Sequence, residues 1–184
     1  EYVRAIATEK DHSATPNTWQ RKDSSIIKNP VSPFPALETL PFKDYGIFGF
    51  QKIIDAKDGW VGIMASRGCP FRCTYCFNHR IVERYKTDLR VPAARLNYIR
   101  HHPVKDVINE IIYLQEHYKN IRMYIFDDDL FTFDEGYVRE FCAAYRKVTT
   151  LPFVANAHVQ VFTPAVARCL KEAGCRIIKF GIES

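Results

Sequence analysis

Long apolar runs are missing from this 184-residue chain, and none approaches the roughly 20 residues that a membrane-spanning helix needs. The N-terminus, Glu1–Arg4, also lacks a basic head followed by an apolar stretch, so it does not resemble a secretory signal. These two absences predict a cytoplasmic protein without a membrane partner. Because the first residue is not Met, we expect the chain to be a fragment.

An excess of positive over negative charge is found in only one segment of the sequence. Residues 80–105 hold seven basic residues against Glu83 and Asp88, which accounts for the whole net charge of +5. Such a segment can hold an anionic substrate or nucleic acid, but the interpretation we favour is a solvated loop. Nucleic acid is therefore not an expected partner.

Regular periodicity is weak in residues 1–59, which contain half of the ten prolines. Residues 19–28 suit two short strands joined at Asp23-Ser24, and residues 30–41 suit an extended connector because each proline restricts the backbone. We interpret residues 1–59 as a linker.

From Trp60 onward, strand and helix patterns alternate. The expected strands are 61–65, 121–126, 153–157 and 176–182; the expected helices follow Pro103, a cap at Asp134, and Thr163-Pro164 with Gly174 closing the last. This alternation predicts a parallel α/β sheet, either half of an eight-stranded barrel or the core of an open doubly wound sheet. The chain ends on a strand without a covering helix, so we expect truncation.

Polar residues follow each expected strand, where parallel α/β folds carry their functional groups. A cysteine-rich loop follows the first strand and Asp127–Asp129 follow the second. Asn156 and His158 follow the third, and Glu183 follows the fourth. We expect all four groups at one edge of the sheet.

Three of the six cysteines, Cys69, Cys73 and Cys76, crowd into a C-x3-C-x2-C loop, while Cys142, Cys169 and Cys175 show no ligand spacing. Three thiolates can each hold one iron of a cubane cluster and leave the fourth iron open. The alternative is a structural zinc site with His79 as the fourth ligand. Iron–sulfur is the interpretation we favour, because no second cysteine pair at zinc spacing follows.

This loop resembles the signature of radical S-adenosylmethionine (SAM) enzymes. Four stretches together are similar to the subgroup with an N-terminal cobalamin-binding domain: 66–78 around the cysteines, Phe126-Asp127-Asp128-Asp129-Leu130-Phe131, Lys171-Glu172-Ala173-Gly174-Cys175 and Gly181-Ile182-Glu183-Ser184. Leu40-Pro41-Phe42-Lys43-Asp44-Tyr45 also looks like the end of the linker in that subgroup. The resemblance covers about residues 30–184.

The resemblance implies an architecture and a set of ligands. Residues 60–184 would be the first half of a (β/α) TIM-like partial barrel, truncated, and 1–59 the linker from an absent cobalamin-binding domain. Cys69, Cys73 and Cys76 would bind a [4Fe–4S] cluster. Contacts with SAM would come from residues that match the family's positions: Tyr75 and Phe77 beside the adenine, Asp127, Asp128 and Asn156 at the strand ends, and Glu183 at the ribose.

The implied activity is reductive cleavage of SAM to a 5′-deoxyadenosyl radical. In this subgroup the outcome is cobalamin-dependent methyl transfer or a related carbon-centred reaction. The implied partners are a small-molecule or metabolite substrate and an electron donor such as flavodoxin or ferredoxin. Two alternatives are a methylthiotransferase-type radical SAM enzyme, which needs a second cluster, and a zinc-stabilised interaction domain.

Overall fold

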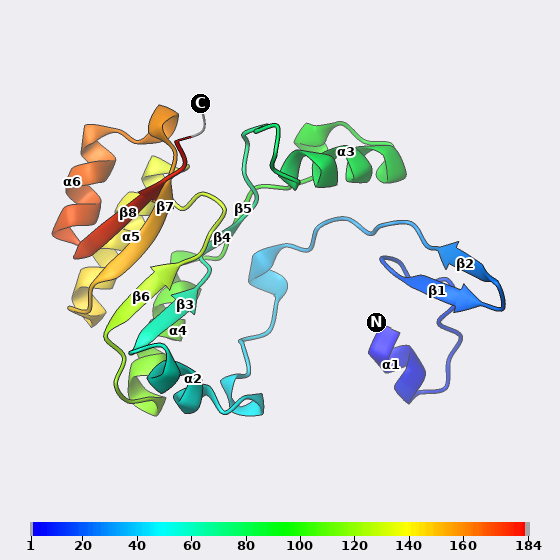
Figure 1. Ribbon diagram of the computed structural model, residues 1–184, viewed down its shortest axis with the longest axis horizontal. Coiled ribbons are helices and arrows are strands. Elements are labelled where there is room, and N and C mark those ends of the chain that lie inside the picture. The colour runs from blue at the N-terminus through cyan, green and yellow to red at the C-terminus, as the bar shows by residue number, and fades with distance from the viewer. Residues whose placement is uncertain (1, 183–184) are drawn as a thin grey trace. The chain divides into compact units, whose positions relative to one another are not determined.

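The computed structural model describes residues 2–182, which form two compact units (Figure 1). The first contains the chain up to Pro35 together with Phe71–Tyr98. The second contains Ala36–Pro70 and the chain from Ile99 onward. The chain therefore leaves the second unit after Pro70 and returns to it at Ile99.

The second unit is built on a four-stranded parallel sheet whose strand order follows the sequence. Its strands are β3 (Trp60–Ile63), β6 (Met123–Phe126), β7 (Phe153–Ala157) and β8 (Cys175–Phe180), and the helices between them are α4 (Val104–His117), α5 (Glu135–Val148) and α6 (Pro164–Glu172). The expected parallel α/β arrangement is confirmed. A parallel sheet of this order, with a helix in each crossover, has the arrangement of a (β/α) partial barrel.

One face of the sheet forms the hydrophobic core with the helices. Alternate strand residues point to that face because side chains in a strand alternate with a period of two. Val61, Ile63, Tyr124, Phe126, Phe153 and Ala155 are all nearly or fully buried there. The helices contribute apolar residues at helical spacing, including Ile111, Leu114, Phe141, Tyr145 and Leu170.

Side-chain caps set the start of two helices, as the sequence predicts. Asp134 accepts a hydrogen bond from the Tyr137 N–H at the start of α5, and Thr163 accepts one from the Val166 N–H at the start of α6. Gly174 ends the turn after α6 with a φ of +95°, a conformation that glycine adopts without steric cost.

Residues 36–59 belong to the second unit and contain structure that the sequence pattern did not predict. They form the short 3-10 helices η1 (Leu37–Thr39) and η2 (Tyr45–Ile47) and the helix α2 (Phe50–Ala56). Lys43 and Tyr45 both donate hydrogen bonds to the carboxylate of Glu110 on α4, which is only 6% exposed. This partly buried ion pair and the hydrogen bond from Tyr45 attach the segment to the helix.

The first unit contains α1 (Tyr2–Ala7), the antiparallel hairpin β1 (Trp19–Lys22) and β2 (Ser25–Lys28), α3 (Asn78–Leu89) and the 3-10 helix η3 (Ala93–Arg95). The hairpin was predicted at the same residues and is confirmed. Phe34 stacks on Tyr85 of α3 with ring centroids 4.0 Å apart, which joins the N-terminal segment to the helix.

The prediction of a solvated loop is wrong for residues 80–89, which lie in α3. Basic and acidic residues pair along this helix: Arg84 with Asp88 at 2.8 Å, and Lys86 with Glu83 at 2.8 Å. Ion pairs at these spacings support a helix despite few buried apolar side chains.

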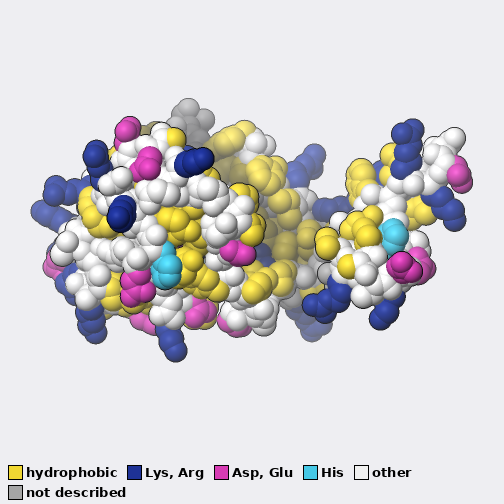
Figure 2. Space-filling view, turned by 90° about the horizontal axis from the view of Figure 1, so that it is seen from below, with side chains coloured by type: hydrophobic (Ala, Val, Ile, Leu, Met, Phe, Trp, Pro, Cys, Tyr) yellow, Lys and Arg dark blue, Asp and Glu magenta, His cyan; other side chains and the backbone are white. Residues whose placement is uncertain are grey.

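Charged side chains of both signs are interspersed on the face that Figure 2 displays. Lys and Arg side chains do not gather into one basic patch on this face. Among residues 2–182, no helix has the length and apolar character to cross a membrane.

Candidate functional site

The cysteine loop starts where a short strand leaves the sheet-bearing unit. That strand, β4 (Ser66–Arg67), pairs antiparallel with β5 (Arg100–His101). Cys69 follows within the second unit, whereas Cys73 and Cys76 belong to the first. The Cys76 N–H donates to the Cys73 carbonyl at 3.0 Å, which closes a tight turn between these two cysteines.

Exposure alone does not separate the loop thiols from the other three, because Cys169 and Cys175 are also partly exposed and only Cys142 is buried. All six cysteines lie in the described part of the chain, and none forms a disulfide there. Cys69, Cys73 and Cys76 are partly exposed. Burial raises the pKa of Cys142 well above its usual range and that of Cys175 to about 11, so these two stay protonated. Metal ligation requires a thiolate, which disfavours Cys142 and Cys175 as ligands.

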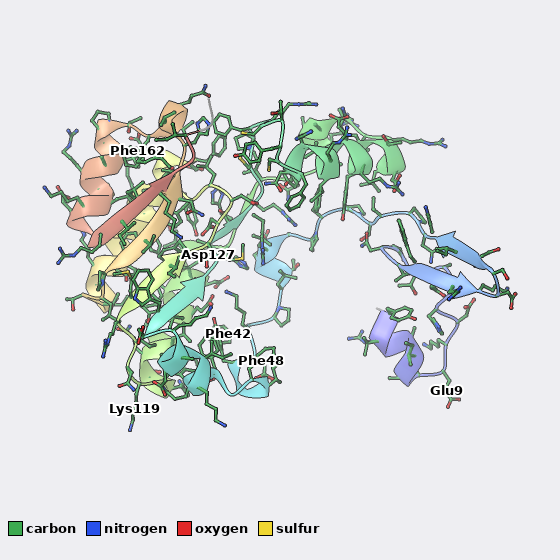
Figure 3. The ribbon with its side chains drawn as sticks, viewed as in Figure 1. Glu9, Phe42, Phe48, Lys119, Asp127 and Phe162 are labelled. Carbon is green, nitrogen blue, oxygen red and sulfur yellow. The ribbon has the colours of Figure 1, made fainter. Side chains whose placement is uncertain are left out.

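Asp127 lies just beyond the carboxyl end of β6 (Figure 3). Its N–H donates to the Ile63 carbonyl at 3.0 Å, which extends the pairing of β6 with β3. Its carboxylate is exposed and leans over Gly62, where a side chain would begin 3.1 Å from the Asp127 Oδ2 atom. Gly62 therefore leaves room for this carboxylate on the sheet face opposite the helices.

Asp128 points the other way and is fully buried. Its carboxylate accepts hydrogen bonds from the Ser66 N–H, the Ser66 hydroxyl and, at 3.3 Å, the Ala65 N–H. Burial raises its pKa to about 6, against the opposing effect of these donors. Its predicted contact with SAM stays a prediction, and the carboxylate oxygens already bind the segment before Cys69.

Asp129, which the sequence analysis did not single out as a site residue, also binds this segment. Its Oδ2 atom accepts a hydrogen bond from the Gly68 N–H at 2.9 Å. No sequence motif indicated this role, because it depends on how β3 and β6 align.

Asn156 connects the third strand to the same edge. Its side-chain amide donates to the Asp128 carbonyl at 2.7 Å. In the register of β7 and β8, Asn156 is paired with Lys179, so the two side chains share the face that Asp127 also occupies. Lys179 was missed by sequence reasoning, since only the pairing register reveals it. Glu183 lies outside the described residues.

The two aromatic residues of the cysteine loop belong to the first unit and are largely exposed. Tyr75 and Phe77 are 70% and 68% exposed. His79, the zinc alternative's fourth ligand, lies on α3 with its Nδ1 atom buried and without a hydrogen-bond partner among the described residues.

Among residues 2–182, no three metal-binding side chains are grouped closely enough to hold a metal ion. It is the chemistry and spacing of the three loop thiols that fit an iron–sulfur cluster with an open iron. Three partly exposed thiols on one loop supply three ligands, which is one fewer than a closed four-ligand site requires. Polar side chains at the strand ends, Asp127, Asn156 and Lys179, lie on the sheet face that the helices leave uncovered.

The sequence of this chain is similar to those of known proteins. Residues 63–184 match the radical SAM superfamily. The chain is 29% identical, over its whole length, to the uncharacterized methyltransferase PH0819 of Pyrococcus horikoshii, of which it covers 38%.

Two solved structures share the fold. One is the radical SAM methyltransferase TsrM from Kitasatospora setae, with tryptophan substrate and a SAM analogue bound: TM-score 0.68, 16% identity, 97% of this chain and 34% of that one. The other is the cobalamin-dependent SAM radical enzyme OxsB, with aqua-cobalamin and SAM bound: TM-score 0.70, 18% identity, 99% of this chain and 26% of that one. The chain thus spans between about a quarter and two fifths of the length of these proteins.

The family match covers most of the chain. It begins at the last residue of β3 and includes the cysteine loop and strands β4 to β8. The superfamily uses a [4Fe–4S] cluster and SAM, in agreement with the ligands expected from the sequence. This chain belongs to the radical SAM superfamily.

Proposed function

We propose that this chain carries the cluster-binding half of a cobalamin-dependent radical SAM methyltransferase. Cys69, Cys73 and Cys76 hold a [4Fe–4S] cluster, and a bound cluster supplies the electron that cleaves SAM reductively. The observation that carries the proposal is the C-x3-C-x2-C loop, which begins immediately after a strand fastened to the carboxyl edge of a parallel sheet.

The chain's own residues bind and orient SAM. Asp127 offers an exposed carboxylate to the methionine amino group, and Asn156 lies beside it on the next strand. Tyr75 and Phe77 offer exposed rings to the adenine, and Glu183 is assigned to the ribose. Lys179 adds a cation on the same face as Asn156, suited to a carboxylate.

The remaining parts of the proposal concern the whole protein. Residues 1–59 lead from a cobalamin-binding domain, and cobalamin bound there would supply the chemistry of methyl transfer to a small-molecule substrate. Three similar proteins support this assignment: PH0819 is named a methyltransferase, TsrM has a tryptophan substrate bound, and OxsB has cobalamin bound. The electron donor is a flavodoxin or a ferredoxin, and the protein works in the cytoplasm.

Anaerobic reconstitution with iron and sulfide tests the proposal directly. We expect about four irons per chain and, after reduction, an electron paramagnetic resonance spectrum that changes when SAM is added. The variant Cys73→Ser should lose this iron. Cys169→Ser is the matched control, because Cys169 is also partly exposed but lies on α6 without ligand spacing.

The zinc alternative keeps one supporting observation, the unpartnered Nδ1 atom of His79. The variant His79→Ala separates the two functions, because only a zinc site with His79 as a ligand loses its metal. Recovery of one zinc per chain, with no iron–sulfur signal, would overturn the radical SAM function.

A further inference from the structure

We propose that Asp128 and Asp129 are positioning residues, which fix the chain segment 65–68 and thereby the place from which Cys69 presents its thiol. The role of Cys69 rests on the proposed function, but the clamp itself is a feature of the protein without its cluster. It gives Asp128 a task different from a direct contact with SAM.

The two carboxylates bind consecutive backbone groups of the segment. Asp128 accepts from the N–H groups of Ala65 and Ser66 and from the Ser66 hydroxyl, and Asp129 accepts from the Gly68 N–H at 2.9 Å. Hydrogen bonds to an ionised acceptor are about twice as strong as neutral ones. The last of these anchored amides immediately precedes Cys69.

The other side of the segment is held by the returning chain. Strand β5 pairs with Ser66 and Arg67, and the His102 N–H donates to the Ala65 carbonyl at 2.8 Å. The Tyr137 hydroxyl of α5 donates to the His102 carbonyl at 2.9 Å. Residues 65–68 are therefore gripped on both sides at the point where the chain leaves the sheet-bearing unit.

These hydrogen bonds hold the segment at a point where the backbone turns sharply, at Gly68. Gly68 has a φ of +92°, and beyond Pro70 the chain runs through another compact unit before it returns at Ile99. The clamp is itself supported by the next strand, since the Asn156 amide donates to the Asp128 carbonyl at 2.7 Å. Three strands thus converge on the segment before Cys69.

Limited trypsin digestion of the chain without its cluster tests the clamp. The exposed Arg67 lies inside the clamped segment, so cleavage after it reports local opening. Each carboxylate oxygen of Asp128 accepts from a backbone N–H, of Ser66 or of Ala65. In Asp128→Asn, the side-chain NH2 group therefore faces one of these N–H donors in either orientation, and that hydrogen bond is lost. We expect cleavage after Arg67 to accelerate about tenfold or more, relative to cleavage after Arg21 in β1.

The matched control is Glu110→Gln, which neutralises another buried carboxylate of the same unit. The Glu110 carboxylate accepts its hydrogen bonds from Lys43 and Tyr45, so the variant should lose thermal stability but leave cleavage after Arg67 unchanged. If Asp128→Asn does not fold, Asp129→Asn decides, because Asp129 is exposed. Cleavage after Arg67 within twofold of wild type in the folded variant would overturn the clamp.

Cluster loading supplies the second readout. After reconstitution, Asp128→Asn and Asp129→Asn should hold less iron than Glu110→Gln, or release it to a chelator several times faster. Equal retention by all three variants would overturn the positioning role. A wild-type chain that takes up no iron–sulfur cluster would refute the proposed function instead, and the digestion would still judge the clamp.

Discussion

Three consecutive aspartates occupy three different environments at the end of β6. Strand alternation sends the Asp127 carboxylate to one face and the Asp128 carboxylate to the other, while Asp129 reaches the Gly68 N–H. The side chains have the same chemistry, so their tasks follow from direction alone. Asp127 is available to a ligand, and the other two bind the protein's own backbone.

The raised pKa of Asp128 makes stability depend on pH in a defined direction. Burial lifts this pKa from the ordinary 3.8 to about 6, so between these values the folded state binds a proton that the unfolded state has lost. The contribution to stability is fully present below pH 4 and is lost as the pH rises through 6. Its size is about 3 kcal/mol.

Denaturant unfolding of the cluster-free chain from pH 4.5 to 7.5 measures this contribution. The difference in unfolding free energy between wild type and Asp128→Asn should fall as the pH rises toward 7, because the variant has no carboxyl group to titrate at this position. Curves that stay parallel over the whole range would contradict the assignment.

At the scale of elements, the junction between α2 and β3 depends on one glycine. Gly59 has a φ of +81°, and a Cβ atom there would lie 2.2 Å from the Asn120 carbonyl oxygen. Neither backbone can move freely, since the Gly59 carbonyl accepts from the Arg122 N–H at 2.8 Å. We expect Gly59→Ala to lower the free energy of unfolding by at least about 2 kcal/mol.

Gly49, at the other end of α2, provides the comparison. Its φ is −70°, and a Cβ atom would meet only the flexible Lys52 side chain at 3.7 Å. Gly49→Ala should therefore cost less than about 1 kcal/mol, the effect expected at a helix N-cap. Thermal or urea unfolding compares the two variants, and equal losses would show that the contact with Asn120 does not matter.

The helices that bury an apolar face against the sheet were predictable from the sequence, as was the exposed β1–β2 hairpin with its turn at Asp23-Ser24, whereas the helices with little buried surface were missed. The helices α4, α5 and α6 and the four strands show apolar periodicity, with caps at Asp134 and Thr163. Helix α3 has Asn78 as its only buried residue among those described, so its sequence shows charge rather than an apolar stripe. Helix α2 buries only Ile54 and is missed for the same reason.

The candidate site was predictable as far as chain position determines it. That polar groups collect at the carboxyl ends of the strands follows from a parallel sheet, and the cysteine spacing suggests its own chemistry. Which aspartate faces a ligand, and that Lys179 lies beside Asn156, depend on pleat and register. These are set by packing between strands far apart in the sequence.

At the scale of the whole molecule, the chain forms two compact units, each with cysteines of the loop. Cys73 and Cys76 belong to the unit that includes the hairpin and α3, and Cys69 belongs to the unit with the sheet. Each unit has its own aromatic anchor to an N-terminal segment. Phe34 stacks on Tyr85 of α3, and Phe42 packs edge-on against Tyr113 of α4 with centroids 5.1 Å apart.

Removal of these anchors should loosen one unit at a time, because each ring contact lies within a single unit. In Phe34→Ala, we expect the amides of α3 to exchange with deuterium about tenfold faster while those of α4 keep their protection, a loss of the size typical of an aromatic pair. Phe42→Ala should give the opposite pattern, with faster exchange in α4 and none in α3. Hydrogen exchange read by mass spectrometry compares both variants, and acceleration in both helices by either one would mean that the units open together. In that case Cys69 and the other two cysteines would respond to a single opening, whereas separate opening would let the α3 unit loosen while the clamp on residues 65–68 stays closed.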